Sequence, residues 1–212
     1  MLSEKDFFEW YSTAAPADLA LMEKVEGFGY LFDDMCFRKG SITYRSVAFW
    51  DENGIILGRD ELPEEIETFN YSMFRYKAQE QDDCLGYFDH SNSLLCVPKN
   101  AEDATIIHEM IHLHEDVYSD LPLFYRDIVL WALYTDLKDR IFKDGKPGLD
   151  GILTNHAHII NCGSVYENGG DHNLLFLLKS FDLDIKMGFQ LGTVFGYGRE
   201  NKFQGYFYTK SE

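Results

Sequence analysis

The sequence predicts an α+β domain in which a small, mainly antiparallel sheet packs against the helix that carries the candidate site. Short apolar segments around turn-forming residues predict β-hairpins, and longer segments with a helical period predict helices. With 212 residues and 45% hydrophobic side chains, the chain can bury a core of its own. We expect residues 81–212 to form the main domain and residues 1–80 an α/β extension packed on the same core.

The N-terminus is predicted to begin with two helices. Ser3 can accept the hydrogen bonds of an N-cap for a first helix that ends at Thr13. Pro16 suits the first turn of a second helix, because proline lacks the N–H group that this turn leaves unpaired. The second helix is expected to end near Gly27, where the glycines begin.

The rest of the extension is predicted to be a hairpin followed by a helix. Residues 41–57 are rich in β-branched and aromatic residues, and Asn53-Gly54 is a preferred two-residue hairpin turn. After Pro63, the segment 64–76 begins with acidic residues, which complement the positive end of a helix dipole. We therefore expect two paired strands and then a third helix.

A second hairpin and a long helix are predicted next. Two apolar segments within residues 84–98 flank the turn-forming cluster 89–93, and Pro98 closes the second segment. Asn100, with Asp103 three residues later, approximates a capping box that opens the helix after this hairpin.

The C-terminal part is predicted to be mainly helical. An apolar helix is expected over residues 121–142, ending at the breaker-rich segment 144–151, which is the one plausible internal linker. Residues 152–162 are apolar without a decisive period, and Asp171 can cap a helix through residues 174–181. The glycine-rich segment 192–198 favours a turn or an aromatic-rich strand over a nucleotide-binding loop.

The motif His108-Glu109-Met110-Ile111-His112 has the form HExxH. On a helix, at about 100° per residue, its two histidines lie some 40° apart around the axis, so both imidazoles can reach one zinc ion. Glu109 lies beside them, where its carboxylate can take a proton from a metal-activated water. An apolar stripe on the opposite side of this helix faces the core, and it is formed by Ile106, Met110, Leu113 and Val117.

A catalytic zinc site needs a third protein ligand and one open position. His172 is the preferred candidate, because it stands at the start of a helix whose apolar residues would dock it against the core. His156, His158 and Glu167 remain open as alternatives.

Two further polar residues of the motif helix are expected to stay outside the ligand set. Glu115 lies on the ligand face but about 10 Å along the axis from His108, so orienting an imidazole suits it better than binding the metal. His114 points away from this face and is expected to be a surface or packing histidine.

Composition excludes several classes of function. The net charge of −17 would repel phosphate backbones, and no basic patch is visible, so we expect no nucleic-acid partner. No apolar segment reaches the roughly 18 to 20 residues of a membrane span, and the acidic N-terminus differs from a signal peptide, so we expect a cytoplasmic protein without a membrane partner. Four separated cysteines without a CxxC pair are expected to be free thiols: Cys36, Cys84, Cys96 and Cys162.

Three segments in this order resemble the SprT-like zinc metalloprotease domain of the minigluzincin group. They are the hairpin CLGYFDHSNSLLCV, the segment TIIHEMIHL and, after a long helix, HNLLF. In that family, a histidine that opens a later helix joins the HExxH pair, in patterns such as HGxxF or HGxxW. Residues 172–176 are similar to this pattern, with Asn173 at the usual glycine. The resemblance covers residues 84–183, about half of the chain.

The resemblance implies a zincin-like fold and a zinc-dependent peptidase, with His108, His112 and His172 as Zn²⁺ ligands and Glu109 as general base. It also implies that the hairpin 84–97 supplies an edge strand along the cleft, to which an extended peptide adds by backbone hydrogen bonds. Related domains often include a zinc ribbon or a basic DNA-binding element, and neither is visible here. DNA-linked proteolysis is therefore not inferred.

We expect the protein to be a zinc metalloprotease, a hydrolase acting on a peptide or protein substrate by a metal-activated water. The alternative is a non-catalytic zinc-binding or peptide-binding module on the same fold, although the presence of Glu109 favours an enzyme. Hydrolysis of a non-peptide amide would use the same residues. Tyr166 and His158 are candidate donors to the developing oxyanion.

Overall fold

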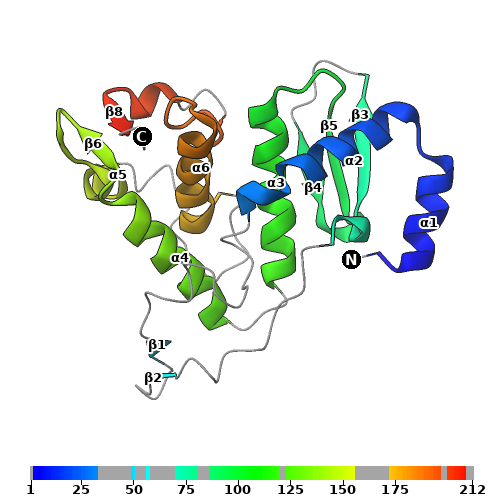
Figure 1. The fold of residues 1–212 in the computed structure, drawn as a ribbon, viewed down its shortest axis with the longest axis horizontal. Coiled ribbons are helices and arrows are strands. Elements are labelled where there is room, and N and C mark those ends of the chain that lie inside the picture. Colours follow the sequence, from blue (N-terminus) through cyan, green and yellow to red (C-terminus); the bar gives the residue numbers. More distant parts are fainter. Residues whose placement is uncertain are drawn as a thin grey trace.

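The computed structural model describes residues 2–32, 49–50, 56–57, 70–80, 86–119, 123–155, 172–196 and 200–208. Helices and short strands are both present in these ranges, as an α+β chain requires, and Figure 1 shows their arrangement. The described strands form one two-stranded and two three-stranded sheets. Every described strand pair is antiparallel except the pair of β3 with β5.

The two N-terminal helices form as predicted. Helix α1 spans Glu4–Thr13, and the side chain of Ser3 accepts a hydrogen bond from the Asp6 amide at its N-cap. Helix α2 spans Pro16–Phe28, with its proline in the first turn, and continues into the 3-10 helix η1 at Gly29–Phe32. A capping serine located the start of α1, and a proline in the first turn located the start of α2.

The next predicted hairpin is confirmed where it is described. Strand β1, Phe49–Trp50, pairs antiparallel with strand β2, Ile56–Leu57. The predicted turn at Asn53-Gly54 lies outside the described residues.

The helix predicted for residues 64–76 is wrong from residue 70 onward. A short 3-10 helix, η4, occupies Tyr71–Met73, and strand β3 follows at Arg75–Gln79. Strand β3 pairs in parallel with β5, and it buries Tyr76 completely. Pairing with a strand that follows later in the chain thus decides the structure of residues 75–79. The acidic start of the predicted helix, residues 64–69, lies outside the described residues.

The second predicted hairpin is confirmed and forms most of the central sheet. Strand β4, Tyr87–Asp89, pairs antiparallel with β5, Leu94–Pro98, and the strand order is β3-β5-β4. The connecting 3-10 helix η5, His90–Asn92, is capped by the side chain of Asp89. This sheet includes a strand from each side of residue 80, and the division of the chain at that residue stays a prediction.

Helix α3, Asp103–Ser119, packs against β4 and β5 and carries the HExxH motif. Ile106, Met110 and Leu113 of its predicted apolar stripe are buried in the core. The side chain of Val117, the fourth member, lies outside the described part of the chain. Helix α2 packs against β3 and α3, so the N-terminal helices and the motif helix share one hydrophobic core.

The C-terminal half contains helices α4, α5 and α6 and a second three-stranded sheet. Helix α4 packs against α6, which in turn packs against α3, and Figure 1 shows α6 between the other two. The order of its elements is α4 at Leu123–Leu137, β6 at Ile141–Lys143, β7 at Lys146–Pro147, α5 at Leu149–Asn155, α6 at Leu174–Met187, the 3-10 helix η6 at Glu200–Phe203 and β8 at Tyr206–Tyr208.

The predictions of a helix to residue 142 and of a linker over residues 144–151 are both wrong. Strand β6 pairs with β7 and β8, so residues 141–147 belong to a sheet. Asp144 and Gly145 have φ values of 50° and 77°, which match the type I′ turn of a tight hairpin. The cluster of breaking residues therefore marks a hairpin turn and the start of α5.

None of the helices that the structure describes is both long enough and apolar enough to cross a lipid bilayer.

Candidate metal centre

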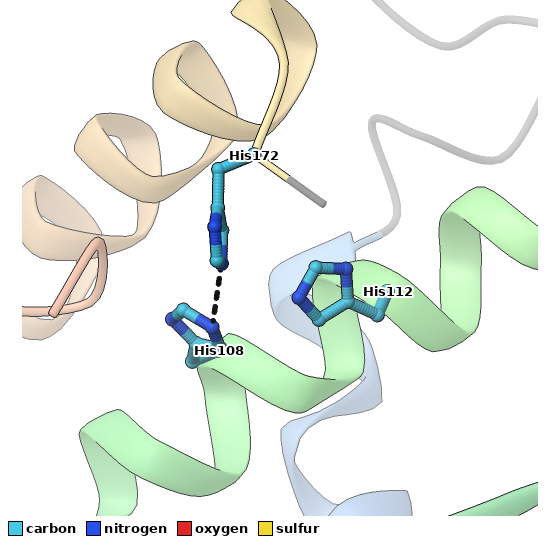
Figure 2. A group of neighbouring side chains, drawn as sticks. All are labelled: His108, His112 and His172. Atoms are coloured by element: carbon cyan, nitrogen blue, oxygen red, sulfur yellow. Dashed lines mark hydrogen bonds between the residues drawn. The ribbon is translucent and has the colours of Figure 1, made fainter. Parts of the chain in front are cut away.

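Three histidines from two distant segments meet between α3 and α6. His108 and His112 lie one turn apart on α3, and His172 precedes α6 by two residues. One nitrogen of each ring lies within 4.8 Å of the other two, close enough for all three to bind one metal ion. Figure 2 shows the three side chains pointing toward one another. The structure therefore brings together the predicted HExxH pair and the preferred third ligand.

The spacing of the nitrogens suits a small cation. Nε2 of His172 lies 3.1 Å from Nε2 of His108. Tetrahedral zinc, with Zn–N bonds of about 2.0–2.1 Å, places its ligand nitrogens about 3.3 Å apart. The spacing of this pair is close to the one that zinc requires, and the same donors also bind other transition metals.

His108 is oriented by a backbone carbonyl. Its Nδ1 lies 2.8 Å from the carbonyl oxygen of Val194, which can only accept, so Nδ1 carries the proton. Nε2 is consequently the unprotonated nitrogen, and its lone pair faces His172. Burial lowers the pKa of His108 to about 4, with the hydrogen bond to Val194 opposing this shift and His112 adding to it. The ring is neutral at physiological pH, and neutral imidazole is the form that binds metals.

His172 is placed by the cap of α6. The side chain of Asn173 accepts a hydrogen bond from the Phe176 amide at 2.9 Å, which makes Asn173 the N-cap residue. The prediction that Asp171 caps this helix was therefore wrong in position, because the helix begins at Leu174. Because the cap is at residue 173, His172 lies just before the first turn of α6, next to α3.

The aromatic ring of Phe176 lies against all three imidazoles. Its centroid is 4.8 Å from that of His108, 4.7 Å from His112 and 4.5 Å from His172. Phe176 is fully buried, so this side of the cluster has an apolar wall. An aromatic residue one turn after His172 thus contacts all three imidazoles and shields this side of them from water.

Glu115 and Asn173 form a second layer around His112. One carboxylate oxygen of Glu115 lies 3.8 Å from Nδ1 of His112, on the side of the ring away from an Nε2 ligand. The other accepts a hydrogen bond from the Asn173 side chain at 3.1 Å. Glu115 thus lies where an orienting partner is expected, and it links the motif helix to the cap of α6.

His114 lies outside the cluster and packs in the core, in agreement with the prediction from the helical period. Its ring stacks on Phe32 at 4.3 Å, and its Nε2 lies 3.2 Å from the Tyr71 hydroxyl. The same helix therefore presents histidines with two different roles on two faces.

Glu109 is buried against the start of the edge strand. Only 3% of its surface is exposed, and a Cβ atom added to Gly86 would lie 2.8 Å from its Cγ and Oε1 atoms. Glycine is needed at residue 86 because the backbone and this carboxyl group approach so closely. Burial raises the pKa of Glu109 to about 7, while the charge of His112 lowers it.

The remaining candidates fall outside the described part of the chain. His156, His158 and Glu167, the alternatives for the third ligand, and Tyr166, a candidate oxyanion donor, all lie there. Of the four cysteines, Cys96 is described, and it is a buried free thiol.

Sequence reasoning missed the role of Val194. Its contribution is a backbone carbonyl, which every residue has, so no residue type could have identified it. The role of Asn173 had a signal, because asparagine immediately before an apolar helical segment is a preferred N-cap.

Comparisons of this chain with models of known protein families, with curated proteins and with solved structures gave no significant match.

Proposed function

We propose that this protein is a zinc-dependent metallopeptidase with a zincin-like, SprT-like fold. The observation that carries the proposal is the meeting of His108, His112 and His172 at metal-binding distance, with the first two on the helix that also holds Glu109. Catalytic zinc sites have three protein ligands and one open position, whereas structural sites are closed by four. In the described residues, the cluster has three members.

The residues of the chain divide the work of hydrolysis. Zinc held by the three histidines would supply Lewis-acid activation of a water molecule and of the scissile carbonyl. Glu109 takes the proton from the attacking water and delivers it to the leaving amine. Phe176 excludes bulk water from one side of the cluster, and the Val194 carbonyl holds the ring of His108 in orientation. Glu115 lies near Nδ1 of His112, where it can orient that ring when the metal is bound.

An extended peptide is the proposed substrate because of what lies beside Glu109. Strand β4 is an edge strand in the described sheet, and Gly86 at its start contacts the Glu109 side chain. Backbone groups on such an edge can pair with an added strand. A peptide bound along β4 therefore passes close to the general base.

The decisive test replaces Glu109 by glutamine, which has the same shape but cannot act as a base. Zinc content, measured by elemental analysis of the purified protein, should stay at one ion per chain. Cleavage of a peptide library, followed by mass spectrometry, should fall by about 10²- to 10⁴-fold. Glu102→Gln, at an exposed acidic residue just before the same helix, is the matched control and should retain full cleavage.

The outcomes separate the candidate functions. Wild-type protein without bound zinc contradicts the proposal, and so does undiminished cleavage by Glu109→Gln. Stoichiometric zinc with peptide binding but no hydrolysis by wild type would instead support a non-catalytic peptide-binding module.

A further inference from the structure

A fully buried carboxyl group lies near the C-terminal end of α6, at the end opposite His172. Asp184 is 0% exposed. Its Oδ2 atom accepts a hydrogen bond from the Gly192 amide at 2.7 Å, and its Oδ1 atom accepts one from the Val194 amide at 2.9 Å. Burying a carboxylate costs several kcal/mol unless such bonds offset the loss of water.

These two bonds hold a turn, residues 192–196, that also contacts the metal centre. The turn is closed by a hydrogen bond from the Gly196 amide to the Gly192 carbonyl at 3.0 Å. Gly192 has a φ of 91°, a conformation that residues with a side chain rarely adopt. Phe195, within the turn, lies 5.7 Å from the ring of His172.

Val194 connects the buried carboxyl group to a metal ligand. Its amide donates to Asp184, and its carbonyl accepts from Nδ1 of His108 at 2.8 Å. The position of one residue therefore decides whether the His108 ring keeps its orientation and its Nδ1-protonated tautomer.

We propose that Asp184 is a positioning residue that sets the metal affinity of the site by holding Val194 against His108. The proposal rests on the metal site described under the proposed function. When the Asp184 side chain no longer accepts from both amides, the turn can shift away from His108. The His108 ring must then be ordered at the moment the metal binds, and this cost lowers the metal affinity. Loss of partners outside the ligand shell typically weakens metal binding by 10- to 100-fold.

The simpler possibility is that Asp184 only stabilises the fold. Asp182 offers a matched control because it is on the same helix and is 2% exposed. Its carboxylate binds Lys179 at 2.7 Å and Lys186 at 2.8 Å, and both lysines donate to the Leu31 carbonyl. Asp182→Asn therefore disturbs a different buried polar network, which joins α6 to η1.

The test measures the zinc affinity of the folded full-length protein by competition with a chelator. Asp184→Asn should bind zinc about 10- to 100-fold more weakly than wild type. Asp182→Asn should lose less than about threefold in affinity even if it lowers thermal stability as much. Equal zinc affinity in wild type and folded Asp184→Asn would overturn the proposal.

A second variant and a second measurement keep the proposal testable if Asp184→Asn does not fold. Gly192→Ala strains the turn at its positive φ while leaving the carboxyl group in place, and it should weaken zinc binding in the same direction. Wild-type affinity in this variant would then overturn the proposal.

NMR of ¹⁵N-labelled histidine in zinc-free protein follows the Nδ1–H proton of His108 directly. This proton should exchange with water faster in the variants than in wild type, and an unchanged exchange rate would also overturn the proposal. If wild type binds no zinc at all, the proposed function fails, while the NMR experiment still decides the role of Asp184.

Discussion

At the scale of single residues, the candidate metal centre depends on an imidazole that is kept neutral. His108 is buried between Val194, Phe176 and the other two histidines, and burial is the main cause of its lowered pKa. A charged ring in this buried position would lose its hydration, which disfavours the protonated form. The folded protein therefore favours the form of His108 that binds a metal.

This lowered pKa predicts how the stability of the metal-free protein depends on pH. The pKa of histidine is 6.5 in its ordinary state and about 4 for His108 in the folded protein, so the unfolded chain takes up the proton first as pH falls. Above pH 6.5 His108 is neutral in both states, and the folded protein has its full stability with respect to this group. Between pH 6.5 and 4 the unfolded chain binds the proton and the folded protein does not, so the free energy of unfolding falls. The loss should reach about 3 kcal/mol in the free energy of unfolding.

Urea unfolding of metal-free wild type and of His108→Gln at a series of pH values checks this prediction. Other groups titrate in both proteins, so the relevant quantity is the difference between their unfolding free energies. That difference should fall as the pH is lowered through the stated range. A difference that is independent of pH would contradict the proposed cause.

The residue scale also shows what could be predicted from sequence. The helical period alone placed His108 and His112 on one face and His114 on another, because side-chain direction in a helix follows from position. The role of Val194 depends on a turn that approaches α3 only in the folded chain. No local pattern contains that information.

At the scale of elements, helix α6 depends on its cap. Asn173 accepts from the Phe176 amide and donates to Glu115, so it joins the helix start to the motif helix. Asn173→Ala should lower the free energy of unfolding by about 1 kcal/mol through loss of the cap. Asn173→Gly should be more stable than Asn173→Ala by about 0.5 kcal/mol or more, because glycine is itself tolerated at an N-cap position.

Urea denaturation of the two variants checks this order. Both lose the bond to Glu115, so their difference isolates the cap. If the alanine variant were as stable as the glycine variant, the cap would contribute nothing measurable.

The elements that were predicted correctly form hydrogen bonds with residues nearby in the sequence, whereas those predicted wrongly pair with distant segments. Helices α1 and α2 and the β4–β5 hairpin pair locally, and turn and capping residues identified them. Strand β3 pairs with β5, and β6 pairs with β8, far along the chain. Local propensity favoured helices in both places, and distant partners decided otherwise.

At the scale of the whole molecule, one core cluster joins the N-terminal helices to α6. Lys179 contributes to this junction, because its fully buried ammonium group donates to the Leu31 carbonyl at 2.8 Å and to Asp182 at 2.7 Å. Lys179→Met should lower the free energy of unfolding by about 3 kcal/mol, since it leaves both acceptors without this donor.

Lys24→Met is the matched control for this substitution. Lys24 forms a salt bridge to Asp103 while both side chains remain well exposed, and such pairs contribute less than about 1 kcal/mol. Thermal or urea unfolding of both variants measures the contrast. Equal losses would show that the buried network adds nothing beyond a surface pair.

The separation of the histidines along the chain has a mechanical consequence. His108 and His172 are 64 positions apart; His108 lies on α3, and His172 immediately precedes the N-cap of α6, which packs against α3. Any ion that both side chains share cross-links the two segments in the folded protein and stabilises the folded state over the unfolded chain, which lacks the assembled site. Binding of such an ion then adds to the stability of the packing between α3 and α6, and a chelator that removes the ion weakens the tertiary structure as well as emptying the site.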